Sequence, residues 1–124
     1  MQVQDVMTAK VLTIDARDTV ARARTRMREK GVHQLVVTAE RGGVVGVIGV
    51  ADVRSVPDGG CVGDFMSRRL FIVRPDTSVG AAAALMRAHA IGCLPVLDGH
   101  RLVGIVTVSD MLDVVDNSDG ALSV

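Results

Sequence analysis

The segment LVGIVTVSDM, Leu102–Met111, carries the pattern that decides the fold of this chain. Its apolar run to Val108 predicts a buried β-strand, and Ser109 and Asp110 then supply the hydroxyl and carboxylate that are typical of a helix start. The same pattern occurs earlier as VVGVIGVADV, Val44–Val53, 58 positions before it. A strand that leads directly into a helix is therefore encoded twice.

The duplication extends over most of the chain. VQDVMT, Val3–Thr8, returns 59 positions later as VGDFMS, Val62–Ser67. The one-residue difference between the two offsets falls in a turn, TAERGG at 38–43 against LDGHR at 97–101, where a change of length costs little. Self-similarity at a fixed period indicates tandem structural repeats. The offset of 59 also joins four apolar pairs: Val20 with Val79, Met27 with Met86, Leu35 with Leu94, and Val37 with Val96.

Each repeat predicts the element order β-α-β-β-α. A short strand, VLTI or LFIV, leads to a helix whose N-cap is Thr19 in the first copy and Ser78 in the second. Gly31 ends the first helix in the left-handed conformation, whereas Ala90 stands at the equivalent place and would cost about 1 kcal/mol there. Two strands and a final helix complete each copy. We expect strands at 11–14, 34–38, 44–50, 70–73, 93–97 and 102–108, and final helices from about Ala51 and Ser109.

These elements define an α/β (α+β) fold of two tandem repeats. We expect the first repeat at 1–56, a linker PDGGC at 57–61, the second repeat at 62–115 and a frayed tail at 116–124. Neither repeat has enough apolar residues to cover its own sheet. The two repeats should therefore pack face to face about a pseudo-twofold axis and form one compact module.

The composition argues against several classes of protein. The 124 residues are 48% hydrophobic but only 2% aromatic, and 14 basic side chains balance 14 acidic ones. The chain has no net charge that would attract it to nucleic acid or to an anionic membrane. No apolar stretch approaches the roughly 18 residues that are needed to span a membrane. Cys61 and Cys93 lack metal-ligand spacing and predict two free thiols. We expect a cytoplasmic protein that is not an enzyme, because no set of acid, base and nucleophile is present.

The end of the last strand of the second repeat has side chains that are suited to a nucleotide-binding site. Thr107, Ser109 and Asp110 place hydroxyls and a carboxylate at a helix N-terminus, where free N–H groups favour an anion. A carboxylate can accept two hydrogen bonds from a ribose diol, and the hydroxyls suit a phosphate. From these residues alone, a strand end followed by an N-terminal helix charge is the simpler explanation.

The equivalent segment of the first repeat, GVIGVAD, departs from this pattern. It keeps Asp52, but Gly49 and Ala51 replace the two hydroxyl-bearing residues. Each lost hydroxyl removes a hydrogen bond worth about 1 kcal/mol. We therefore expect two unequal sites.

The tandem repeat order, the opening VQDVMT, the helix exit LMRAHAIGCLPVLD and the closing GIVTVSDML resemble the cystathionine-β-synthase (CBS) domain family. The resemblance covers the chain to about Val115 and is that of a stand-alone tandem pair, or Bateman module. It implies a regulatory sensor that binds an adenosine nucleotide or related adenosyl ligand in the cleft between repeats, with AMP, ADP, ATP or S-adenosylmethionine as candidates and no required cofactor. It also implies a homodimer and an unidentified regulated protein.

The resemblance further implies which residues line two clefts, because such pairs join the Thr and Asp of one repeat to the early strand and helix-exit residues of the other. The favoured cleft then contains Thr8, Leu12, Thr13, Ile14, Val32, His33, Gln34, Thr107, Ser109 and Asp110. The weaker cleft contains Asp52, Ser67, Phe71, Ile72, Gly92 and Cys93.

Other functions stay open on the sequence. Gly49 and Ala51 also suit a dimerisation or protein-interaction module that binds no ligand and whose sites are vestigial. The basic face of the first helix could contact RNA or DNA, although the balanced charge and the lack of aromatic stacking platforms favour simple solvation of that face. His33, at the helix exit, could approach a phosphate or a base, or lie exposed in a loop.

Overall fold

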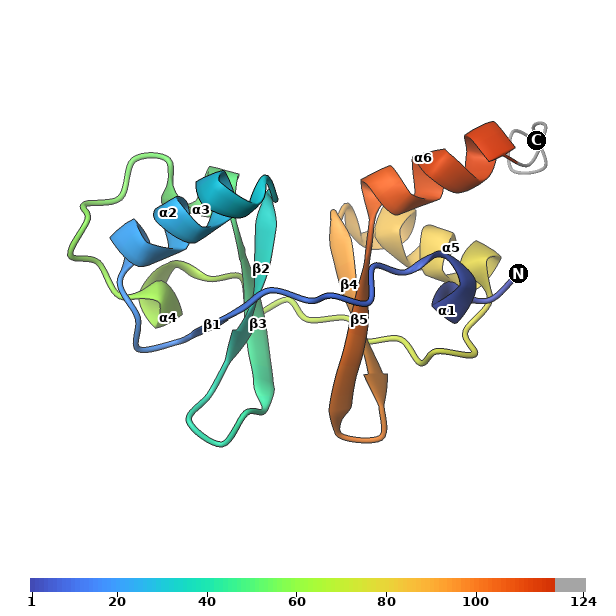
Figure 1. The fold of residues 1–124 in the computed structure, drawn as a ribbon, viewed down its shortest axis with the longest axis horizontal. Coiled ribbons are helices and arrows are strands. Elements are labelled where there is room, and N and C mark those ends of the chain that lie inside the picture. Colours follow the sequence, from blue (N-terminus) through green and yellow to red (C-terminus); the bar gives the residue numbers. More distant parts are fainter. Residues whose placement is uncertain (118–124) are drawn as a thin grey trace. The chain divides into compact units, whose positions relative to one another are not determined.

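The structure is a computed structural model that describes residues 1–117, with side chains described to residue 112. The chain divides into two compact units (Figure 1). We call residues 12–70 the central unit, and residues 1–11 together with the chain from residue 71 the terminal unit. The opening segments are thus exchanged: residues 1–11 belong to the unit built by the second repeat, and residues 62–70 to the unit built by the first.

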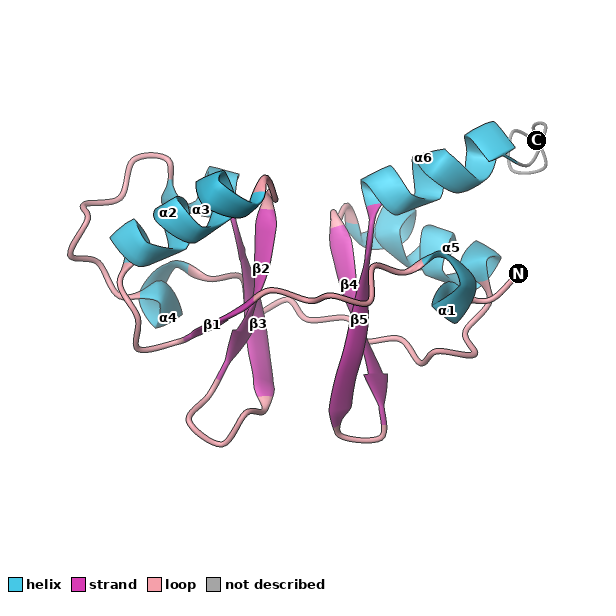
Figure 2. Cartoon of the chain, viewed as in Figure 1, coloured by secondary structure: helices cyan, strands magenta, loops and turns pink. Residues whose placement is uncertain are grey.

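The central unit is a three-stranded sheet with helices on one face (Figures 1 and 2). The strand order is β1-β2-β3, with β1 parallel to β2 and β2 antiparallel to β3. The predicted order β-α-β-β-α is confirmed here. Its elements are β1 (Thr13–Asp15), α2 (Val20–Lys30), β2 (Gln34–Thr38), β3 (Val44–Gly49), α3 (Val50–Val53) and α4 (Val62–Phe65).

The terminal unit has a two-stranded antiparallel sheet, β4 paired with β5. As in the central unit, its helices lie on one face of the sheet (Figure 1). The single helical turns α1 and α4, formed by the two opening segments, were not predicted. The elements of this unit are α1 (Val3–Val6), α5 (Val79–His89), β4 (Cys93–Asp98), β5 (Arg101–Thr107) and α6 (Val108–Asn117).

The strand predicted at 70–73 is wrong: this segment makes only one isolated parallel bridge, between Val73 and Val96. Pro95 explains the loss. In the central unit the Val36 N–H donates to the Leu12 carbonyl over 3.1 Å. Pro95 stands 59 positions after Val36 and has no N–H to donate, so the equivalent ladder bond cannot form.

Both predicted helix caps are confirmed. The Thr19 hydroxyl accepts a hydrogen bond from the Arg22 N–H over 3.2 Å, and the Ser78 hydroxyl accepts one from the Ala81 N–H over 3.1 Å. At the other ends, Gly31 has φ 65° and Ala90 has φ 52°, both in the left-handed region. Ala90 therefore holds a conformation that its Cβ disfavours.

Each unit has its own aliphatic core. Val3 from α1 is fully buried in the terminal unit, and Val62 from α4 is fully buried in the central unit. The exchanged opening segments therefore supply core side chains to the units they join, and neither repeat keeps its whole core within its own stretch of sequence. Of the predicted frayed tail, residues 118–124 lie outside the described residues.

Candidate ligand-binding site

The junction of β5 and α6 fixes one carboxylate at the start of a helix. Asp110 Oδ2 accepts hydrogen bonds from the Thr107 N–H over 2.8 Å and from the Thr107 hydroxyl over 3.0 Å. The Asp110 N–H donates in return to Thr107 Oγ1 over 3.2 Å. These reciprocal bonds form a capping box in which the acid occupies the third helical position. The two residues hold each other in place where β5 becomes α6.

Thr8 reaches the same carboxylate from the opening segment. Its backbone pairs with Ile105 of β5, with the Thr8 N–H to Ile105 O at 2.9 Å and the Ile105 N–H to Thr8 O at 3.0 Å. The Thr8 hydroxyl then donates to Asp110 Oδ1 over 3.2 Å. Gly104 allows this approach, because a Cβ there would collide with the Met7 side chain.

The chemistry of the junction suits a vicinal diol. A carboxylate has about four lone-pair positions, and Asp110 uses three of them, two on Oδ2 and one on Oδ1. Rotation of the exposed Thr8 hydroxyl would free Oδ1 to accept from two new donors. Ser109 is exposed on the first turn of α6, where unpaired N–H groups favour an anion.

The equivalent junction of the central unit is simpler. Asp52 Oδ2 accepts from the Gly49 N–H over 2.7 Å, and Gly49 has no side chain with which to complete the cap. Ser67 pairs with Val47 as Thr8 pairs with Ile105. The Ser67 hydroxyl, however, accepts from the Arg69 N–H over 3.3 Å. Among the described contacts, no hydroxyl donates to Asp52.

The remaining predicted residues fall in both units. Of the favoured set, Thr8, Thr107, Ser109 and Asp110 belong to the terminal unit, and Leu12, Thr13, Ile14, Val32, His33 and Gln34 to the central unit. Of the weaker set, Asp52 and Ser67 belong to the central unit, and Phe71, Ile72, Gly92 and Cys93 to the terminal unit. Both clefts stay predictions.

Within each unit, the helix exit lies beside the strand-to-helix junction of that same unit. The Gly92 carbonyl accepts from the Val108 N–H over 3.1 Å, and Cys93 pairs with Thr107 across β4 and β5. The His33 carbonyl likewise accepts from the Val50 N–H over 3.1 Å.

The predicted residues also differ in how their side chains lie. Ile14 is 5% exposed and belongs to the core, so only its backbone could face a ligand. His33 is exposed. Phe71 stacks on His89 with ring centroids 4.0 Å apart, which sequence spacing did not indicate.

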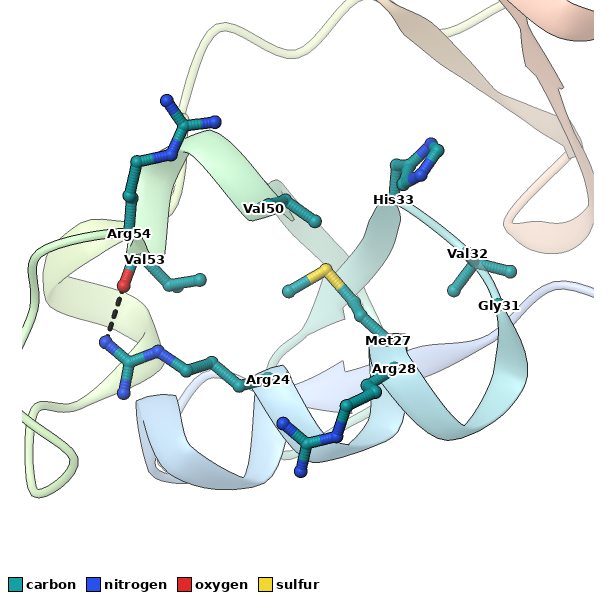
Figure 3. A pocket seen from close by; sticks show the side chains of 9 residues that line it. All are labelled: Arg24, Met27, Arg28, Gly31, Val32, His33, Val50, Val53 and Arg54. Atoms are coloured by element: carbon teal, nitrogen blue, oxygen red, sulfur yellow. Dashed lines mark hydrogen bonds between the residues drawn. The ribbon is translucent and has the colours of Figure 1, made fainter.

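Two of the predicted residues, Val32 and His33, line a groove between α2 and α3 of the central unit, with a volume of about 370 Å³, whose basic lining was not predicted from the sequence (Figure 3). Arg24, Arg28 and Arg54 line it. The four-residue spacing of Arg24 and Arg28 on a helix could have indicated a shared basic edge. The basic face of the first helix was instead interpreted as solvated, with contact to RNA or DNA as the less favoured alternative. No group of three or more His, Cys, Asp or Glu side chains among the described residues could hold a metal ion.

Two α/β repeats, each ending in a strand that runs into an acid-capped helix, define the class of this protein as a tandem-repeat α/β module. The sequence profile of the CBS domain matches residues 3–59 and 62–117. The chain belongs to the CBS domain family and contains two tandem CBS domains.

Several known proteins are similar to this chain in sequence. The CBS domain-containing protein YhcV of Bacillus subtilis is 32% identical over 115 residues, which is 88% of this chain and 81% of the relative. Homoserine O-acetyltransferase of Methanococcoides burtonii is 35% identical over 112 residues, 88% of this chain. The chain spans only 23% of the length of that protein, and 34% of the length of the uncharacterized protein MJ1404 of Methanocaldococcus jannaschii.

Solved structures share the fold. The CBS domain pair of protein MJ0100, in complex with 5′-methylthioadenosine and S-adenosyl-L-methionine, has a TM-score of 0.88 at 23% identity, with 95% of this chain and 98% of that chain covered. The cytosolic domain of the Mg²⁺ channel MgtE, in complex with ATP, has a TM-score of 0.80 at 30% identity, with 91% of this chain and 48% of that chain covered. No helix in residues 1–117 is long and apolar enough to cross a membrane.

Proposed function

We propose that this chain is a regulatory module that binds an adenosine nucleotide or a related adenosyl ligand at the junction of β5 and α6. The observation that carries the proposal is the Asp110 carboxylate, which Thr107 fixes at a helix N-terminus and which the Thr8 hydroxyl reaches at 3.2 Å. In this proposal the ribose diol displaces Thr8 and donates to Asp110, while Ser109 and the helix N-terminus face any phosphate.

The ligands of two similar structures support the class of ligand. 5′-Methylthioadenosine, S-adenosyl-L-methionine and ATP, which are bound in those proteins, share an adenosine group and differ in what is attached to its 5′ carbon. A site built around the ribose would accept all three, whereas a site built around phosphates would not. AMP, ADP, ATP and S-adenosylmethionine are therefore the ligands to test.

The regulatory part of the proposal concerns what the ligand changes. Occupancy can shift a conformational equilibrium only if the ligand binds one state more tightly than the other. We propose that the chain forms a homodimer in the cytoplasm, that the ligand alters the geometry of this dimer, and that a regulated protein senses the change. In this proposal the chain itself catalyses no reaction. Within the described residues Cys61 and Cys93 are not joined by a disulfide, which is consistent with a reducing compartment.

Titration calorimetry of the full chain with AMP, ADP, ATP and S-adenosylmethionine tests the proposal. Asp110→Ala should weaken binding of the preferred ligand by about 10- to 100-fold, because it removes charge-assisted hydrogen bonds. The matched variant Asp52→Ala removes the equivalent carboxylate of the central unit and should weaken it by less than about threefold. Asp110→Asn keeps an acceptor for the helix cap and separates loss of binding from loss of stability.

The alternative, an interaction module with vestigial sites, is favoured by Gly49 and Ala51. It predicts no binding heat with any of the four ligands and no retained ligand in native mass spectrometry of the purified protein, while self-association persists. Equal effects of Asp110→Ala and Asp52→Ala on affinity would instead contradict the assignment to the β5–α6 junction.

A further inference from the structure

The groove between α2 and α3 has the size and the lining of a small-molecule site (Figure 3). Its volume of about 370 Å³ lies within the range of ligand pockets, which are mostly apolar and contain a few polar groups. Met27, Val50 and Val53 form an apolar floor between the two helices. Met27 and Val53 are each 3% exposed, whereas Val50 is 41% exposed. An apolar group can therefore cover Val50 without displacing a core side chain.

The arginines at this groove have two different roles. Arg24 braces it, because its guanidinium donates to Val53 O over 2.5 Å and to Asp58 Oδ1 over 2.6 Å and so holds the end of α3 against α2. The side chains of Arg28 and Arg54 are exposed, and within the described part of the chain they make no hydrogen bond or ion pair. The groove is thus already formed, and two cationic groups at its rim are available to an anion.

The second repeat folds without most of this cationic rim. The residues equivalent to the floor are also apolar: Met86, Val108 and Met111. Ala83 stands in place of Arg24, and Leu112 in place of Arg54, so only the equivalent of Arg28 is basic. Because the terminal unit forms the same helical layer without these arginines, the architecture does not require their charge. The two repeats share the apolar floor, and the rim charges are a separate feature of the central unit.

We propose that the groove between α2 and α3 binds a small amphipathic anion, a carboxylate or a phosphate ester that carries an apolar group. The apolar group packs on the floor, and the long exposed side chains of Arg28 and Arg54 bind the anionic group. A small molecule fits better than a peptide helix, because α3 is a single turn of four residues and extends for about 6 Å. The groove contains no residue of the β5–α6 junction, so this inference does not depend on the proposed function.

NMR of the full chain, labelled with ¹³C at its methionine methyl groups, tests the proposal with octanoate, octyl phosphate and uncharged octanol as probes. At least one of the anions should shift the methyl signal of Met27 and leave that of Met86, the equivalent residue of the terminal unit, unchanged. Octanol should bind at least about tenfold more weakly, since it forms no charge-assisted hydrogen bond. Equal binding of octanol, equal shifts of both methyl signals, or no shift of Met27 would each contradict an anion site in the groove.

Removal of the rim charges tests the role of the two arginines. Arg28→Gln with Arg54→Gln should weaken binding of the anions by at least about tenfold. The matched control, Arg26→Gln with Lys30→Gln, removes two charges from exposed residues of α2 that do not line the groove. It should bind the probes within about threefold of the wild type, and circular dichroism should show that both variants fold. Equal losses in the two variants would mean that overall charge, and not the rim, attracts the probes.

The adenosyl ligands distinguish this site from the one in the proposed function. Asp110→Ala should leave octanoate binding unchanged, and Arg28→Gln with Arg54→Gln should leave the affinity for AMP, ADP, ATP and S-adenosylmethionine in calorimetry within about threefold of the wild type. If saturating ATP removed the shift that octanoate causes at Met27, the groove would be part of the adenosyl site. That result would overturn this inference and leave the proposed function standing. Absence of adenosyl binding, with the Met27 shift intact, would have the opposite meaning.

Discussion

Among the described residues, Asp52 at the end of β3 accepts one hydrogen bond, from the backbone of Gly49, whereas Asp110 at the end of β5 accepts three, two from Thr107 and one from Thr8. Both acids occupy the same helical position and complement the helix dipole. A glycine N-cap costs only a few tenths of a kcal/mol relative to the best caps. Helix initiation alone therefore explains Asp52, but it does not require the hydroxyls that surround Asp110.

The two units also differ where the opening segments cross the sheets. Ser67 pairs with Val47 of β3, and Thr8 pairs with Ile105 of β5. The geometry is repeated, yet only Thr8 has a hydrogen bond to the acid of its unit. The two repeats therefore share the same backbone arrangement at this crossing. They differ in the hydrogen bonds of side chains that the backbone pairing does not require.

The largest expected difference between the units concerns the glycines under these crossings. A Cβ at Gly46 would lie 2.6 Å from the backbone oxygen of Ser67, whereas a Cβ at Gly104 would first meet the flexible end of Met7. We expect Gly46→Ala to lower the free energy of unfolding by about 3 kcal/mol and Gly104→Ala by about 1 kcal/mol. Urea denaturation measures both, and equal losses would show that the two crossings are equally rigid.

The helix ends provide a contrast of intermediate size. Gly31 and Ala90 both adopt left-handed backbone conformations, at φ 65° and 52°. Ala90→Gly should therefore stabilise the protein by about 1 kcal/mol, and Gly31→Ala should destabilise it by a similar amount. Thermal unfolding of the two variants shows whether each substitution raises or lowers the stability of the protein. A destabilising Ala90→Gly would mean that the alanine methyl makes packing contacts that outweigh its backbone strain.

An exchange of N-caps sharpens the comparison of the two junctions. Thr107→Gly removes both bonds of the threonine hydroxyl with Asp110 and should cost about 0.5–1 kcal/mol. Gly49→Thr adds a cap to α3, but its Cβ would lie 3.2 Å from the His33 carbonyl oxygen, so we expect a gain of only about 0.3 kcal/mol. Chemical denaturation of both variants and of the double variant measures these changes. A gain at Gly49 as large as the loss at Thr107 would show that the central junction accommodates a threonine without strain.

The smallest contrast is electrostatic. At the end of β1, the central unit has the ion pair Asp15 and Arg17. The terminal unit has Arg74 and Asp76 at the positions 59 residues later, with the charges exchanged. Hydrogen bonds from the Arg17 side chain and backbone lower the pKa of Asp15. Arg17→Ala should move the pKa of Asp15 back toward its ordinary value, which an NMR titration would detect.

The sign of the linked pH effect follows from this lowered pKa. The pair stabilises the folded state while Asp15 is ionised, and its contribution disappears as the pH falls through the lowered pKa of Asp15. Arg74→Ala is the matched control and should leave the Asp15 titration unchanged. An unaltered Asp15 titration in Arg17→Ala would show that Arg17 is not the cause of the shift.

Much of the fold could be predicted because its signals are local. The strands Gln34–Thr38 and Cys93–Asp98, the caps Thr19 and Ser78, and the left-handed end of α2 follow from residues within one or two turns of each position. The left-handed end of α5 follows only from the repeat, because Ala90 disfavours that conformation. Pro95, which lacks the N–H needed for pairing, also explains why no strand forms at 70–73. That prediction failed because the missing donor lies more than twenty residues from the strand whose pairing it prevents.

By itself, the sequence determined the duplication, the element order of each repeat and the asymmetry between Gly49 and Thr107, since composition and periodicity encode these directly. Only the tertiary structure decided that the opening segments exchange units, that Thr8 reaches an acid 102 positions away, and that Arg24 ties α2 to the end of α3. The physical reason is the path of the chain. Contacts between distant residues depend on which sheet edge a crossing segment joins. Hydrophobic periodicity predicts the secondary structure of each segment, but it does not predict which other segment it pairs with.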